Sequence, residues 1–222
     1  SLLFFQPKMA LKILPTPDEF RQAGLPVDRL LITKGRALFQ NNDYTESVET
    51  YSQIPQDSDF WLTAIEEKSH VQGKAGNYDQ AIANFTTLFS PVFHKVLGPE
   101  AYFTATLTYQ RVCQFSKVFE YINLFKEQMK QRITDLTRLV EGQQNEVIFN
   151  AAQSLREKRY HSVAYAQTAP LLPYSFHLDF TVRDLILKGH LQNNKNQLIQ
   201  RVVTLAQQDL NDIKSHLTQI QL

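Results

Sequence analysis

The chain has 222 residues, enough for one or two domains with a sizeable core, and its 23 Lys and Arg nearly balance its 22 Asp and Glu. This balance, with both signs interspersed, gives no reason to expect nucleic acid or an anionic membrane as the main partner. The single cysteine, Cys113, excludes an internal disulfide and a multi-cysteine metal site, but it leaves the compartment open between periplasm and cytosol. Few glycines and many Leu, Ala, Gln and Lys favour helices, and no apolar run is long enough to span a bilayer.

Prolines dominate the start of the chain. Four of them lie within residues 1–27 and forbid a long helix there. A short helix is predicted over Asp18–Gly24, with Pro17 near its start and Gly24 as its stop. We expect residues 1–27 to pack on the apolar face of the first helical hairpin. The alternative is a tether from a preceding domain or a membrane anchor.

Two stretches, residues 35–51 and residues 69–85, match at a fixed offset. Tyr44 pairs with Tyr78 and Tyr51 pairs with Phe85, each 34 residues further on. A fixed period of this size is typical of stacked helical hairpins. Apolar residues at helical spacing and turn residues at 41–43 and 75–77 predict two hairpins, over residues 28–55 and 58–91. Asp28 is expected to cap the first helix.

Two further copies are predicted downstream. The third opens at Pro99 and is offset by 37 residues, since Phe115 stands where Tyr78 stands in the second copy. Its return helix meets no proline before about Gln144, so we assign residues 99–144 to it, including one long helix. Residues 145–172 have the apolar spacing of a degenerate fourth hairpin, with Tyr160 in the place of the turn tyrosine.

Residues 173–222 leave the period and are predicted to form a helical cap. A helix is expected over Phe180–Lys188, followed by a turn at 193–196. Apolar side chains in residues 197–222 then recur at alternating spacings of four and three, which is a heptad seam. The seam consists of Ile199, Val203, Ala206, Leu210, Ile213, Leu217 and Ile220. We expect this helix to pack on residues 174–188 as an end cap, and the alternative is a helix that makes the chain a homodimer.

The turn and return helix of the second hairpin, residues 75–85, have the most specific sequence pattern in the chain. These residues read AGNYDQAIANF. This wording resembles the tetratricopeptide repeat, over about half of the chain. The resemblance implies that small residues such as Gly35 and Ala81 stand where paired helices cross closely. The layout, with a long helix after the third copy, is also similar to bacterial helical-repeat proteins. The resemblance implies an all-α fold, a right-handed α-solenoid of stacked antiparallel hairpins with an irregular helical C-terminal part.

In that family the first helices of successive hairpins line a concave groove that takes an extended peptide or a partner helix. The resemblance therefore implies a partner-binding face whose cations outnumber its acids and which includes aromatic side chains, the usual interface hot spots. Its predicted members are Arg29, Ile32, Arg36, Phe39, Gln40, Glu66, His70, Lys74, Phe103, Leu107, Gln110 and Arg111. We expect an acidic-apolar peptide as the ligand. The alternative is a groove filled by the chain's own N-terminal segment or C-terminal helix.

The sequence carries no catalytic, metal or cofactor motif. No two histidines have the spacing of a metalloprotease helix, and no glycine loop suits a phosphate. His70 and Glu66, one turn apart, are expected to be an ordinary surface pair, and Cys113 is expected to be a buried structural thiol.

We therefore predict a non-catalytic scaffold that binds a protein partner, with no cofactor, no metal, no nucleic acid and no direct membrane insertion. The main alternative is a structural domain of a larger chain or assembly that self-associates through residues 197–222. A weaker alternative is an enzyme whose site is assembled in space near His70 or Cys113.

Overall fold

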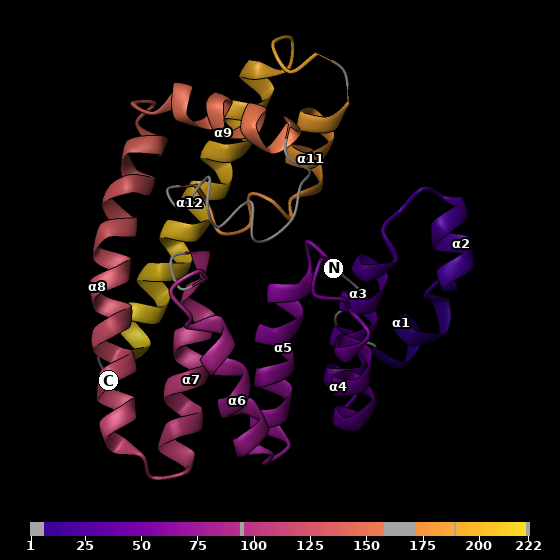
Figure 1. Ribbon diagram of the computed structural model, residues 1–222, viewed down its shortest axis with the longest axis vertical. Coiled ribbons are helices and arrows are strands. Elements are labelled where there is room, and N and C mark those ends of the chain that lie inside the picture. The colour runs from indigo at the N-terminus through magenta and orange to yellow at the C-terminus, as the bar shows by residue number, and fades with distance from the viewer. Residues whose placement is uncertain (1–6, 94–95, 158–171, 189, 221–222) are drawn as a thin grey trace. The chain divides into compact units, whose positions relative to one another are not determined.

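The computed structural model (Figure 1) describes residues 7–93, 96–157, 172–188 and 190–220. Within these residues the chain forms eleven helices and no strand, which confirms the predicted all-α class. The chain divides into two compact units, residues 1–86 (unit 1) and residues 87–222 (unit 2). Helices that follow one another in the chain pack together in unit 1, whereas a right-handed solenoid stays a prediction.

Unit 1 begins with two short helices that both pack on the third. The helices of this part of the chain are α1 (Pro7–Ile13), α2 (Pro17–Gln22), α3 (Val27–Gln40), α4 (Tyr44–Ser52), α5 (Trp61–Lys74) and α6 (Tyr78–Leu88). The side chain of Thr16 caps α2 and forms a capping box with Glu19, and Gly24 follows the helix at a positive φ. α3 starts one residue before Asp28, so the predicted cap lies inside the first turn, where its negative charge still suits the helix dipole.

The turns between the paired helices α3/α4, α5/α6 and α7/α8 have the same backbone geometry. Each contains a residue in the left-handed region, namely Asn42 (φ 66°), Gly76 (φ 83°) and Cys113 (φ 58°). The following N–H donates to the carbonyl oxygen five residues earlier, from Asp43 to Leu38 (2.9 Å), Asn77 to Gln72 (2.9 Å) and Gln114 to Tyr109 (3.0 Å). This is the Schellman arrangement, and it satisfies carbonyl groups that a helix end leaves open. The turns predicted at residues 41–43 and 75–77 are thus confirmed.

Gly35 is required where α3 and α4 cross. A Cβ atom at this position would lie 2.5 Å from the ring of Tyr51, which is closer than any real side chain allows. The buried hydroxyl of Ser47 donates a hydrogen bond of 2.8 Å to the carbonyl oxygen of Gly35. Together these contacts fix the ring of Tyr51 over the glycine and hold the two helices at close approach.

In unit 2, the long C-terminal helix packs against four other helices. The unit contains α7 (Pro99–Arg111), α8 (Phe115–Val140), α9 (Asn145–Glu157), α11 (Phe180–Leu187) and α12 (Lys195–Ile220). Figure 1 shows α12, drawn in yellow, beside α8. α12 packs mainly along α8 and also contacts α7, α9 and α11. α12 thus packs on α11, as expected for the end cap, and packs more extensively on α8.

The heptad seam predicted for α12 has the wrong phase. Of its described side chains only Ala206 and Ile213 are fully buried, and the others are half-buried. Most of the buried positions lie one residue earlier, at Leu198, Val202, Leu205 and Asp209. The face that α12 presents to its own unit is therefore not the strict heptad face.

A buried ion pair fastens α12 to α8. The side chains of Arg132 and Asp209, 7% and 2% exposed, lie 3.3 Å apart. Asp209 also accepts a hydrogen bond of 2.9 Å from the backbone N–H of Tyr174, and Arg132 donates one of 3.2 Å to the carbonyl oxygen of Leu172. Burial raises the pKa of Asp209 to about 6, although the charge of Arg132 acts in the opposite direction.

Two further expectations, the fourth hairpin and the lack of a membrane-spanning segment, can be compared only with the described residues. α9 coincides with the first helix of the predicted fourth hairpin, and the returning half of that hairpin falls on residues 158–171, outside the described residues. Among the helices that are described, none combines the length and the apolar character needed to cross a bilayer.

Candidate partner-binding surface

Eight of the twelve predicted binding residues lie on α3 and α5 of unit 1. Exposed side chains are Arg29, Arg36, Gln40 and Lys74, and half-buried side chains are Phe39, Glu66 and His70. Ile32 is different, because it is only 4% exposed. It belongs to the core of unit 1, and its prediction as a contact residue is wrong.

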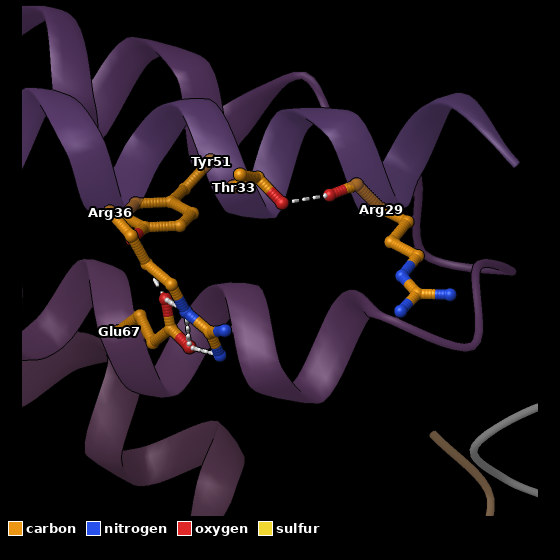
Figure 2. A network of polar contacts seen from close by, with 5 residues as sticks. All are labelled: Arg29, Thr33, Arg36, Tyr51 and Glu67. Carbon is orange, nitrogen blue, oxygen red and sulfur yellow. Dashed lines mark hydrogen bonds and ion pairs between the residues drawn. The ribbon is translucent and has the colours of Figure 1, made fainter. Parts of the chain in front are cut away.

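Arg36 is held in place by a residue that the sequence prediction missed. Its Nε lies 3.0 Å from both carboxylate oxygens of Glu67, and its Nη2 donates to Oε1 of the same carboxylate. Figure 2 shows this fork-shaped contact between α3 and α5, with the hydroxyl of Tyr51 donating to Oε2 of Glu67 at 2.7 Å. The three side chains, which we call the Arg36 network, join α3, α4 and α5.

The contact between Arg36 and Glu67 could have been predicted from their spacing in the sequence. Arg36 and Glu67 are 31 residues apart, three short of the period, so that they lie about one helical turn off register on successive first helices. An opposite pair of charges at this spacing predicts an ion pair between neighbouring hairpins. The prediction from the sequence counted Glu66 as the only acid on this face.

Burial and charge set the protonation states in the Arg36 network. Desolvation followed by the negative charge of Glu67 raises the pKa of the Tyr51 phenol, which therefore remains a hydrogen-bond donor. Desolvation would lower the pKa of Arg36, but the bonds to Glu67 outweigh it and raise that pKa. The network thus consists of a cation, a carboxylate and a neutral phenol.

An aromatic cluster lies one helical turn from Arg36. The rings of Phe39 and His70 meet edge to face, with centroids 5.3 Å apart, and the centroid of the Tyr44 ring lies 5.8 Å from that of Phe39. Phe39 follows Arg36 by three residues on α3, so the cation and the ring are neighbours on one face. Together they can accommodate a segment that carries a carboxylate beside an apolar side chain.

In Figure 2, the side chains of Arg29 and Arg36 extend from the same side of α3. Between them, the hydroxyl of Thr33 donates a hydrogen bond of 2.9 Å to the carbonyl oxygen of Arg29. This bond occupies the threonine on its own helix, as is common for hydroxyl groups within helices. On this side of α3, the charged groups are therefore the guanidinium groups of Arg29 and Arg36, with the Thr33 hydroxyl bonded within the helix.

The other four predicted residues form an exposed stripe on α7 of unit 2. Leu107 is 41% exposed, and Gln110 and Arg111 are also exposed. Phe103 is half-buried, because the ring of His216 on α12 meets it edge to face at 5.6 Å. The chain's own C-terminal helix therefore covers the first position of this stripe.

His216 is also held by polar contacts on α7 and α12. Its Nε2 lies 2.9 Å from a carboxylate oxygen of Glu100, and its Nδ1 lies 2.8 Å from the carbonyl oxygen of Asp212. Both partner atoms, a carboxylate oxygen and a carbonyl oxygen, are hydrogen-bond acceptors. The contact with Glu100 connects the C-terminal part of α12 to the start of α7, whereas the contact with Asp212 lies within α12.

The described residues show no constellation for metal chemistry. No cluster of three or more His, Cys, Asp or Glu in this part of the chain could hold an ion. Cys113 is exposed, so the expectation of a buried thiol is wrong. Its place at the left-handed position of the α7/α8 turn puts the side chain outside the hairpin core.

No family model, no curated protein and no solved structure matches the chain.

Proposed function

We propose that the chain is a non-catalytic scaffold whose tetratricopeptide-like hairpins bind an acidic-apolar segment of a partner protein. The binding face is the side of α3 and α5 that carries Arg36, Phe39 and His70. The single observation that carries this proposal is the placement of a fixed guanidinium beside an aromatic cluster on two successive first helices. Arg and aromatic side chains are the groups that most often dominate the energy of protein interfaces.

The assignment to tetratricopeptide-like hairpins is part of the same proposal. It is supported by three turns of one geometry at positions 42, 76 and 113, and by the packing of α4 on both α3 and α5. It is also supported by the glycine at the α3/α4 crossing, where that family favours a small residue. Stacked hairpins of this kind would form the predicted right-handed solenoid.

Selection from a random peptide library displayed on phage, with the full chain as bait, tests the proposal. We expect enrichment of peptides in which Asp or Glu lies next to an apolar residue, and a loss of affinity of about tenfold or more in a Phe39→Ala variant. Lys34→Ala is the matched control, since Lys34 is exposed on α3 and outside the predicted face. Equal binding by Phe39→Ala and Lys34→Ala would contradict the assignment of the face.

The second candidate function is self-association through residues 197–222. It is favoured by the apolar seam side chains of α12 that are only half-buried, among them Ile199, Val203 and Leu210. Light scattering of the full chain over a range of concentrations measures it directly. A constant monomer mass would rule it out, whereas a dimer mass would place the chain in an assembly of its own copies.

A further inference from the structure

We propose that Glu67 is an internal competitor for the partner's carboxylate at Arg36. In the free protein Glu67 holds the guanidinium, and an acidic side chain of the partner displaces it when it binds. This inference rests on the proposed function, because it specifies how the same face recognises and admits its ligand.

The geometry of the contact is that of a ligand. Arginine recognises carboxylates through two parallel N–H donors, and Glu67 accepts from two such donors, Nε and Nη2. Within the described residues the remaining nitrogen, Nη1, makes no hydrogen bond. An incoming carboxylate can therefore contact Nη1 first and then replace Glu67 on the guanidinium.

The energetics of the pair favour exchange. The Arg36 side chain is 56% exposed and that of Glu67 is 23% exposed. Ion pairs with this degree of contact with water contribute little to stability, because solvent screens them and two long side chains must be ordered. Exchanging one carboxylate for another on Arg36 is therefore nearly neutral, and the apolar contacts of the partner can decide the outcome.

Tyr51 gives Glu67 a hydrogen-bond partner that remains when Arg36 is released. Its hydroxyl donates to Glu67 at 2.7 Å, and its raised pKa keeps the proton on the phenol. The ring packs directly over Gly35, so its position is set by the α3/α4 crossing and not by Arg36. A half-buried carboxylate that keeps one hydrogen bond avoids most of the desolvation penalty of an unpaired group.

The position of Phe39 specifies the rest of the ligand. It lies one helical turn from Arg36 and is supported by the edge contact with His70. A segment that places a carboxylate on Arg36 can therefore place a neighbouring apolar side chain against this ring. The ligand class is an acidic residue adjacent to an apolar one, with the acid bound in the place that Glu67 now occupies.

The test uses the most enriched acidic-apolar peptide from the library selection, synthesised with a fluorescent label. Its binding to the full-length chain is measured by fluorescence anisotropy for the natural sequence, Glu67→Gln and Glu66→Gln. Glu66→Gln is the matched control, because it removes the same charge from a neighbouring position whose charge also acts on Arg36. We expect Glu67→Gln to bind the peptide about two- to fivefold more tightly than Glu66→Gln, the range that an exposed ion pair corresponds to.

Two further measurements separate the possible results. An analogue of the peptide with Gln or Asn in place of its acids should show no such gain, and thermal unfolding verifies that both variants are folded. Equal affinities of Glu67→Gln and Glu66→Gln for the peptide would overturn the inference. The proposed function would still stand in that case, provided that the natural chain binds the peptide and Phe39→Ala loses affinity for it. A natural chain that selects no acidic-apolar peptide would overturn both.

Discussion

Each unit contains a network of an arginine, a carboxylate and a tyrosine, and the two networks differ in exposure and in reach. In unit 1, Arg36, Glu67 and Tyr51 join three helices that follow one another in the chain. In unit 2, Arg132 pairs with Asp209, 77 residues further on, and Tyr174 supplies its backbone N–H and ring. The first arginine side chain is 56% exposed and the second 7%.

This difference assigns different roles to the same three side-chain types. An exposed pair exchanges its partner with water or with a ligand at low cost, which suits a binding surface. A buried pair cannot lose one member without leaving a charge in a medium of low polarity. The same three residue types therefore form an exposed network in unit 1 and a buried one in unit 2, and burial is what distinguishes them.

The largest expected effect is the loss of Arg132. In Arg132→Met the carboxylate of Asp209 stays buried without its cation, and we expect the free energy of unfolding to fall by about 3–5 kcal/mol. Arg36→Met, which makes the same change in the exposed network, should cost about 1 kcal/mol or less. Urea unfolding followed by circular dichroism measures both. Similar losses for the two variants would break the distinction between the networks.

A pH dependence is expected from the buried network. Because the pKa of Asp209 is raised to about 6, above the value of an unfolded aspartate, the folded chain holds this proton more tightly. Its contribution to stability is complete below about pH 4 and is lost as the pH rises through about 6, by about 2–3 kcal/mol. Urea unfolding of the natural chain and of Asp209→Asn across this range isolates the effect. Parallel profiles would contradict it.

A smaller effect than in the buried network is expected at the base of the Arg36 network. Gly35→Ala pushes the ring of Tyr51 away and costs about 1–3 kcal/mol in strain, which the better helix propensity of alanine reduces to about 1–2 kcal/mol. In Gly35→Ala combined with Tyr51→Leu, the smaller side chain should recover part of this loss. A calorimetric double-mutant cycle measures the coupling. Additive effects would show that the ring does not depend on the glycine.

Much of unit 1 follows from local rules that the sequence displays. The left-handed turn positions were expected from residues 41–43 and 75–77, and the helix ends agree within a few residues. Glycine at position 35 was correctly associated with a close helix crossing. These features are determined by neighbours in the chain, which makes them readable from short patterns.

The arrangement in unit 2 was harder to predict because it depends on distant residues. Arg132 and its partner Asp209 are 77 residues apart, too far for a local pattern to connect them. The heptad pattern of α12 selected the wrong face, since the pattern contains no information on which helix will cover it. The same limit applies to Ile32 and Glu67, whose exposure and pairing depend on how α3 and α5 pack.

The separation of 77 residues in the sequence between Arg132 and Asp209 has a consequence for biosynthesis. During translation, α8 is complete long before residue 209 has been made, so Arg132 must stay solvated or bound elsewhere in the meantime. The hairpins of unit 1 close over much shorter stretches, with Tyr51 and Glu67 only 16 residues apart. Contacts between near residues form early and contacts between distant ones late. The nascent chain should therefore form the helix pairs of unit 1 first, while its C-terminal half passes through a stage in which chaperones could recognise the uncovered side of α8.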